Sequence, residues 1–236
     1  MPGDDLGAAL VALGLEHDLP TLSRNAADSM GVLSDAEAWL REKVPTAEAA
    51  ELDVVVLGSF ARLEASLESD FDYLIMVHGL PSDVRAGRRL LEAIDDFIRS
   101  IRTRGPGRTG LFGHITAAAD LTERIGLEQD TNLSQSRRLL LLEESRSVYQ
   151  PELHDRLLRA VLERYLADYG GKPKAGAPRF LLNDVQRYWY TLAVDYQAKR
   201  WEDASSGWGL RYLKLLNSRK VAYAGTLVSL LRCDDE

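Results

Sequence analysis

The hydrophobic pattern of the chain begins with a helical segment. Apolar positions over residues 1–48 recur at helical spacing among polar residues. Within this segment, Ser34-Asp35-Ala36-Glu37 has the form of a capping box and precedes the apolar residues Trp39, Leu40 and Val44. We therefore predict an N-terminal helical segment over 1–48, with a helix that begins at Ser34.

The pattern then changes to short β-branched and aromatic runs. The runs at 53–57, 71–77 and 111–116 are predicted strands, and Gly58 ends the first of them. Ser82 is a predicted cap for a helix with apolar positions at Leu90, Leu91, Ile94, Phe97, Ile98 and Ile101. The order strand, short helix, strand, helix, strand predicts a small α/β domain over 49–122.

The rest of the chain, 123–236, is predicted to be a helical domain. Apolar stripes at 153–166, 181–196 and 210–231 have helical spacing, and the Gly- and Pro-rich stretch 170–178 is a predicted loop. The expected fold class is therefore α/β (α+β), with an N-terminal helical segment and a C-terminal helical bundle.

Composition excludes several classes of protein. Cys233 is the single cysteine among 236 residues, so neither an internal disulfide nor a cysteine zinc cluster can form. The longest apolar runs, such as 54–57 and 139–142, are too short to cross a membrane. Asp4 and Asp5 stand where a signal peptide would carry lysines. We expect a cytoplasmic protein with no membrane partner.

The charge is negative and unevenly distributed. A formal net charge of −7 disfavours a protein that coats DNA or RNA. Residues 171–236 hold 11 basic and 7 acidic residues, whereas residues 1–170 hold 18 and 29. This division fits a polyphosphate bound by the basic part and divalent cations bound by the acidic part. It fits equally two solvated surfaces of different composition.

The segment from Leu57 to Met76 carries the candidate chemistry. A hydrophobic strand ends in Gly58-Ser59, where glycine permits a sharp turn and close approach of a ligand. Ser59 offers a hydroxyl and a backbone N–H to a phosphate oxygen. Asp70 and Asp72 alternate with Phe71, so both carboxylates are expected on one face of the second strand.

Two neighbouring carboxylates repel each other unless a cation lies between them. Oxygen ligands favour Mg²⁺ or Mn²⁺, so we expect Asp70 and Asp72 to be metal ligands that face a phosphate held by Gly58 and Ser59. This geometry suits in-line attack on a nucleoside triphosphate. The competing structural interpretation is a strand–turn–strand in which both aspartates cap turns.

The same residues resemble the signature of the DNA polymerase β-like nucleotidyltransferase superfamily. The extended pattern Gly-Ser-x-x-Arg-x-Glu, followed by Ser-Asp-x-Asp, is present with Arg62, Glu64 and Ser69 in place. The resemblance implies a small mixed-sheet nucleotidyltransferase domain over 49–122, with catalytic Asp70 and Asp72. It also adds Arg62 and Ser69 to Gly58 and Ser59 as nucleotide-binding candidates.

The superfamily usually has a third carboxylate on a later strand, which acts as base and metal ligand. The resemblance therefore implies a third acid here, and we assign that role to Asp120. Glu128 and Asp130 are alternatives, and without a third acid a nucleotide-binding protein with little turnover becomes the better interpretation. His114, near the third strand, is more often a packed polar residue than a ligand.

The C-terminal helices offer further candidates for nucleotide contacts. Arg187 and Lys199 belong to a polar stripe at steps of three and four residues, which also includes Asp184, Thr191 and Asp195. Lys214 adds positive charge, with Arg211, Arg219 and Lys220. These cations could hold the triphosphate, or they could belong to a solvated helix surface with ion pairs.

The expected activity is transfer of a nucleoside monophosphate from a triphosphate, with ATP favoured, to a hydroxyl acceptor, with release of pyrophosphate. Mg²⁺ or Mn²⁺ is the expected cofactor. A protein or small molecule is the favoured acceptor, and tRNA is a further option. The segment from Ile125 to Ser145 is loosely similar to bacterial protein-modifying nucleotidyltransferases. The alternative is a non-catalytic nucleotide sensor or interaction module, for example a toxin–antitoxin component.

Overall fold

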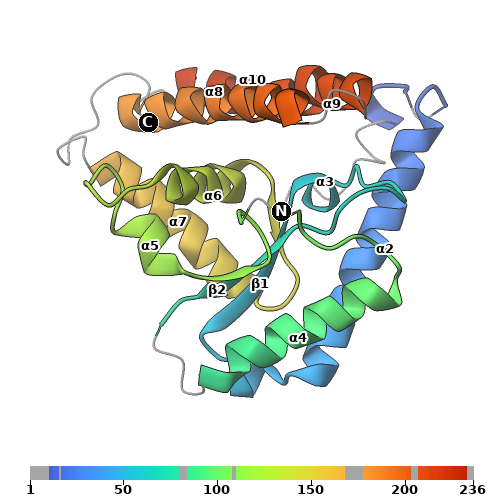
Figure 1. Ribbon diagram of the computed structural model, residues 1–236, viewed down its shortest axis with the longest axis vertical. Helices are drawn as coiled ribbons and strands as arrows, with labels where there is room; N and C mark the ends of the chain where they lie inside the picture. The colour runs from blue at the N-terminus through green and yellow to red at the C-terminus, as the bar shows by residue number, and fades with distance from the viewer. Residues whose placement is uncertain are drawn as a thin grey trace. The chain divides into compact units, whose positions relative to one another are not determined.

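The computed structural model describes residues 11–15, 17–79, 84–107, 110–167, 178–202 and 207–232. A long helix comes first in this part of the chain, four strands interleaved with helices follow, and further helices end it (Figure 1). This order confirms the predicted α/β fold with helical segments before and after the sheet.

The bounds of the elements are as follows. The strands are β1 (Leu52–Leu57), β2 (Tyr73–Val77), β3 (His114–Ala117) and β4 (Ser145–Ser147). The first helices are α2 (Pro20–Lys43), the 3-10 helix η1 (Thr46–Glu48), α3 (Gly58–Ala61), α4 (Val84–Ser100), α5 (Ala118–Thr122) and α6 (Asn132–Glu143). The later helices are α7 (Pro151–Ala167), α8 (Arg179–Glu202), α9 (Trp208–Lys214), the π-helix η2 (Leu215–Arg219) and α10 (Lys220–Leu231).

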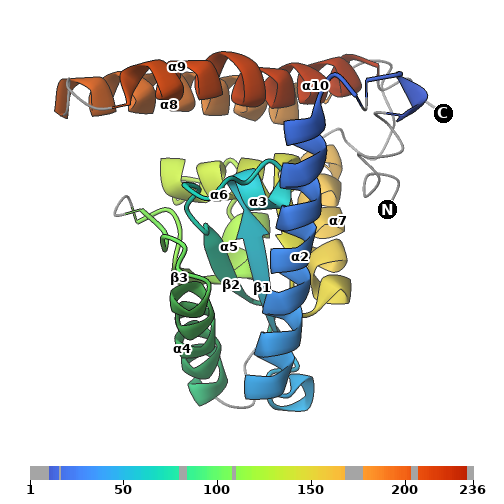
Figure 2. The same ribbon diagram turned by 90° about the vertical axis from the view of Figure 1, so that its right-hand side faces the viewer.

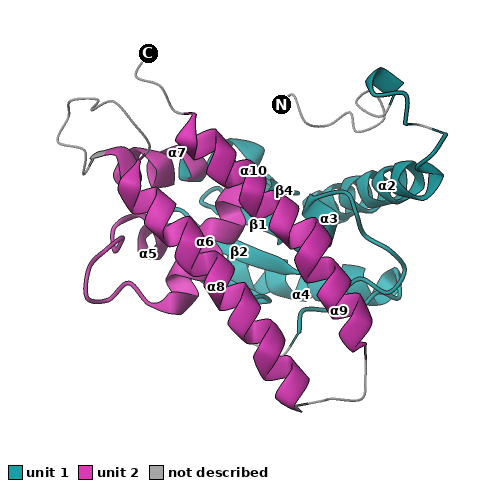
Figure 3. Ribbon diagram, turned by 90° about the horizontal axis from the view of Figure 1, so that it is seen from above, with its two compact units in different colours: residues 1–118, 144–157 teal, residues 119–143, 158–236 magenta. Residues whose placement is uncertain are grey.

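The chain divides into two compact units (Figure 3). The first unit comprises residues 1–118 and 144–157, and the second comprises residues 119–143 and 158–236. The first unit therefore holds the predicted N-terminal segment together with all four strands of the sheet.

The sheet of the first unit is mixed, with strand order β3-β2-β1-β4. β1 pairs antiparallel with β2 and β4, whereas β2 and β3 run parallel. The three predicted strands are present, although β3 begins at His114 rather than at residue 111. The short strand β4 was not predicted, because three residues with polar and charged side chains carry no strand pattern.

Helices α2 and α4 pack on one face of this sheet (Figures 1 and 2). Leu40 from α2 and Ile94 from α4 are fully buried against Val54 and Ile75 of the strands. The indole N–H of Trp39 donates to the Ala93 carbonyl at 2.9 Å and ties the two helices together. Apolar residues of the other strand face, such as Val55 and Leu74, are also buried.

The helix starts predicted from local signals need correction. The prediction that a helix begins at Ser34 is wrong, because α2 runs without interruption from Pro20 and Ser34 lies inside it. Proline at the first helical turn needs no N–H partner and so marks the true start. The predicted cap Ser82, and the predicted loop except for Pro178, lie outside the described residues.

The second unit contains a buried charged network around Arg138. Its guanidinium donates to both carboxylate oxygens of Asp130, at 3.1 and 2.8 Å, and to the Tyr165 hydroxyl at 2.8 Å. It also donates to Asp184 at 3.3 Å, and Asp184 accepts from Tyr165 at 2.7 Å. The network links α6, α7 and α8 because each supplies one of these groups.

None of the described helices combines the length and apolar character needed to cross a bilayer.

Asp53 is a buried carboxyl group in β1. Its Oδ1 accepts hydrogen bonds from the Ser147 hydroxyl at 2.7 Å and from the Gln150 N–H at 2.8 Å, which joins β1 to β4 and to the start of α7. Its Oδ2 has no hydrogen-bond partner among the described residues. Burial raises the pKa of Asp53 from 3.8 to about 7, because the charged form is poorly solvated.

This raised pKa predicts a pH-dependent penalty on stability. Well below pH 3.8 the carboxyl is protonated in the folded and unfolded states alike. As the pH rises towards 7, Asp53 ionises in the unfolded state but stays protonated in the folded state. Ionisation therefore favours the unfolded state over this pH range. The stability of the wild type should therefore fall relative to Asp53→Asn by roughly 3 kcal/mol across this range. Urea unfolding of both proteins at several pH values measures the difference, and a difference that stays constant with pH would contradict the assignment.

Candidate functional site

The turn that follows β1 is built on Gly58. The backbone of Gly58 has φ +69°, a conformation that favours glycine, and it leads directly into α3. The Gly58 N–H donates to the Glu144 carbonyl at 3.1 Å, and the Gly58 carbonyl accepts from the Arg62 N–H at 3.0 Å. The neighbouring Ser59 is half-buried, and its hydroxyl has no hydrogen bond to any described residue.

Asp72 lies beside this turn. A Cβ atom added at Gly58 would meet the Oδ2 atom of Asp72 at 3.6 Å. The Leu57 N–H donates to the Asp72 carbonyl at 2.9 Å, so the pairing of β1 with β2 extends as far as Asp72. The end of one strand thus places the Asp72 carboxylate next to the Gly58 turn.

Asp70 and Asp72 lie on the same side of the chain. Phe71, between them, is fully buried in the core, with its ring centroid 4.9 Å from that of Phe60 and 6.0 Å from that of Phe97. Since side chains alternate along extended backbone, the two aspartates project away from this core. Asp70 is exposed, and its backbone forms a bridge to Arg104.

The donor set fits a magnesium ion that also binds phosphate. Mg²⁺ usually keeps several waters and is held by one or two carboxylates together with substrate phosphates. Asp70 and Asp72 would be these carboxylates. No cluster of three or more histidine, cysteine, aspartate or glutamate side chains arranged to hold a metal occurs in the described part of the chain.

Arg62 is held by two carboxylates at the same turn. Its side chain forms ion pairs with Glu64, at 3.1 Å, and with Glu144, and it is 18% exposed. Glu144 thus contacts the turn twice, through its carbonyl to Gly58 and through its carboxylate to Arg62. We did not predict this role of Glu144 because β4, which it precedes, is too short to be recognised from the sequence.

Ser69 lies in the turn just before Asp70. It is 6% exposed, and its hydroxyl accepts a hydrogen bond from the Ser66 N–H at 3.0 Å. The Ser69 N–H donates in turn to the Ser66 carbonyl, also at 3.0 Å. The observed contacts of Ser69 therefore stabilise the loop that leads into Asp70.

Asp120, the predicted third carboxylate, lies in α5 and belongs to the second unit. It forms an ion pair with Arg124 at 2.9 Å, and its side chain is 40% exposed. β3 runs parallel to β2 and ends at Ala117 opposite Val77, and Asp120 follows it in α5. Of the alternatives, Asp130 pairs with Arg138, and Glu128 is exposed.

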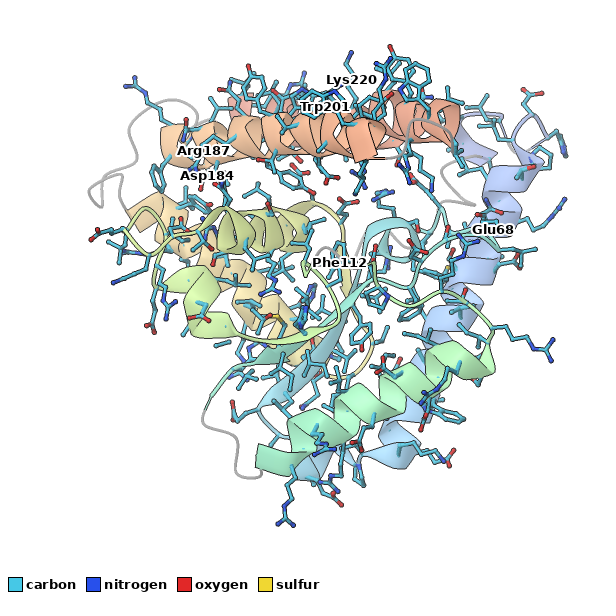
Figure 4. The ribbon with its side chains drawn as sticks, in the orientation of Figure 1. Glu68, Phe112, Asp184, Arg187, Trp201 and Lys220 are labelled. Atoms are coloured by element: carbon cyan, nitrogen blue, oxygen red, sulfur yellow. The ribbon has the colours of Figure 1, made fainter. Side chains whose placement is uncertain are left out.

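The basic candidates Arg187, Lys199 and Lys214 also belong to the second unit. Arg187 pairs with Asp184 at 3.1 Å, and Lys199 pairs with Asp195 at 2.7 Å. Arg187 and Asp184 are both labelled in Figure 4. Lys214 is exposed at the end of α9. The described contacts of Arg187 and Lys199 are thus ion pairs within one helix, and a role in phosphate binding stays a prediction for all three.

No model of a known protein family matches this chain, and neither does any curated protein. The interpretation of the site therefore depends on its own residues and on the geometry of the first unit.

The φ of Gly58 predicts a specific cost of substitution. Gly58→Ala should lower the free energy of unfolding by about 1 kcal/mol, because a Cβ is unfavourable in left-handed backbone. The nearest contact, at 3.6 Å, is an ordinary distance, so the cost is conformational rather than steric. Gly31→Ala is the matched control, since a Cβ there meets nothing within 4 Å inside α2 and alanine favours helix. Equal effects of the two substitutions in urea unfolding would show that the Gly58 backbone is not constrained.

Proposed function

We propose that the protein is a Mg²⁺-dependent nucleotidyltransferase, which moves a nucleoside monophosphate from a nucleoside triphosphate to a hydroxyl acceptor and releases pyrophosphate. The observation that carries this proposal is the position of the Asp72 carboxylate next to the Gly58 turn. The bend offers close access to a phosphate, while the carboxylates offer charge to a cation bound with it.

Each part of the site has a role in this proposal. Gly58 allows the triphosphate to approach the backbone, and Ser59 donates its N–H and hydroxyl to phosphate oxygens. Asp70 and Asp72 hold Mg²⁺, which when bound neutralises phosphate charge and polarises the P–O bonds. The acceptor oxygen forms a bond to the α-phosphorus as the bond to the pyrophosphate oxygen breaks. Arg62 and Glu144 keep the turn in place.

A nucleotide-binding protein without turnover is the second candidate. The absence of a third carboxylate between residues 110 and 117, the segment that leads into and forms β3, favours this alternative. A phosphate can bind at the Gly58 turn without any reaction, whereas transfer also needs the acceptor to be deprotonated. Tight binding of a triphosphate with no release of pyrophosphate would identify this function.

The test of the proposal uses isosteric amides. The full chain is incubated with each α-labelled nucleoside triphosphate and Mg²⁺, alone and with cell lysate or small hydroxylated acceptors, and pyrophosphate and labelled product are measured. Asp70→Asn and Asp72→Asn should each reduce transfer to below about one hundredth of the wild-type rate, because they remove negative charge from the cation site.

Glu68→Gln is the matched control for this experiment. Glu68 lies in the same loop and is strongly exposed, and its one described ion pair is with Arg104 at 2.8 Å. Loss of this exposed pair should leave transfer within about two-fold of the wild type. Circular dichroism checks that each variant is folded. Transfer that survives in a folded Asp72→Asn variant would refute the proposal.

A further inference from the structure

His114 lies on the same sheet face as Asp72. β3 is parallel to β2, and His114 is paired with Leu74, two residues after Asp72. On the opposite face, the Cδ1 atom of Ile115 lies 3.4 Å from a Cβ built at Gly87 in α4. Since successive side chains of a strand alternate, His114 faces away from α4, as Leu74 and Asp72 do.

The strands also place His114 close to Asp72. Neighbouring strands lie about 4.8 Å apart and two residues advance a strand by about 6.6 Å, so the two Cα atoms are separated by about 8 Å. The imidazole and the carboxylate project from one face at this separation.

The imidazole of His114 is accessible. His114 is exposed, and its ring has no hydrogen bond or ion pair with any described residue. Phe112, which is labelled in Figure 4, and the other residues from Gly110 to Ala117 include no acid. Two other histidines of this unit lie elsewhere in it: His154 contacts Ser145 at 2.8 Å, and His78 follows the far end of β2.

We propose that His114 is the general base of the transfer, an inference that rests on the proposed function and adds a catalytic residue to it. A neutral imidazole nitrogen takes the proton of the acceptor hydroxyl as its oxygen forms a bond to the α-phosphorus. The bond between the α-phosphorus and the pyrophosphate oxygen breaks, and pyrophosphate leaves with the electron pair. The imidazolium then returns its proton to water.

The chemistry of the neighbouring groups favours His114 for this step. The proposed function assigns Asp70 and Asp72 to the cation, so another group is needed to take the proton of the acceptor. Histidine is the most common general base in enzymes, and His114 lies on the same sheet face as Asp72.

The first test compares His114→Ala with Asp120→Asn, the variant of the competing candidate. His114→Ala should lower kcat by about 100-fold or more and change the KM for the triphosphate by less than about three-fold. Added imidazole should restore a measurable part of kcat to His114→Ala, whereas loss of kcat in Asp120→Asn together with wild-type kcat in His114→Ala would assign the base to Asp120 instead. His17→Gln, which replaces another exposed histidine, is the control and should behave as the wild type.

Two results of the first test would overturn the inference. One is a His114→Ala enzyme with wild-type kcat, and the other is a His114→Ala enzyme whose lost activity imidazole cannot restore. Loss of transfer in Asp72→Asn with normal transfer in His114→Ala would leave the proposed function intact and refute only the role of His114. If the wild type transfers no nucleotide, the proposed function fails, and the role of His114 fails with it.

The second test requires no activity. In the full chain, Mn²⁺ bound at Asp70 and Asp72 should broaden the imidazole NMR signals of His114, which are assigned by their absence in His114→Gln. The broadening should disappear in the Asp70→Asn/Asp72→Asn double variant. If Mn²⁺ broadens other signals of the site in the wild type but leaves those of His114 sharp, the histidine is too far from the cation to act in the reaction, and the inference is wrong.

Discussion

The antiparallel pairing of Leu57 with Asp72 fixes the geometry on which the site depends. The Leu57 N–H donates to the Asp72 carbonyl, so the last residue of β1 and the residue that precedes β2 lie side by side. A register shift of one residue would move Asp72 to the face of Phe71 and bring a phenyl ring to the Gly58 turn. The buried contacts of Phe71 with Phe60 and Phe97 oppose such a shift. Hydrophobic packing on one face of the sheet thus sets the position of the carboxylates on the other.

Contacts of Glu144 with Gly58 and Arg62 stabilise the Gly58 turn. Glu144 accepts the Gly58 N–H through its carbonyl and binds Arg62 through its carboxylate, so the segment before β4 holds the start and the end of α3. Asp53, on the same strand as Leu57, connects β1 to Ser147 and to the first residues around α7. Glu144 has a cationic partner, Arg62, whereas Asp53 accepts hydrogen bonds only from neutral groups. Burial therefore raises the pKa of Asp53 to about 7.

The sequence predicts the elements around the site well because each has a strong local signal. The β-branched run before Gly58 and the apolar run after Asp72 are continuous and short, as in buried strands, and they form β1 and β2. Ser34 shows where local signals fail: a capping box can occur inside a helix when packing of residues such as Ala36 and Leu40 continues the helix through it. The role of Glu144 depends on a tertiary contact across many residues, and no spacing rule reveals such a contact. The sequence favours a packed role for His114, and only the sheet register places His114 on the face of Asp72.

The central claim is that the Gly58 turn and the two aspartates form one site for a metal-bound triphosphate. The most direct test is a crystal structure of the full chain with Mn²⁺ and a non-hydrolysable nucleoside triphosphate, with anomalous scattering used to locate the manganese. We expect the anomalous peak between Asp70 and Asp72, with a phosphate oxygen within hydrogen-bond distance of the Ser59 N–H. A triphosphate bound elsewhere on the protein, or manganese with no contact to either aspartate, would contradict the account.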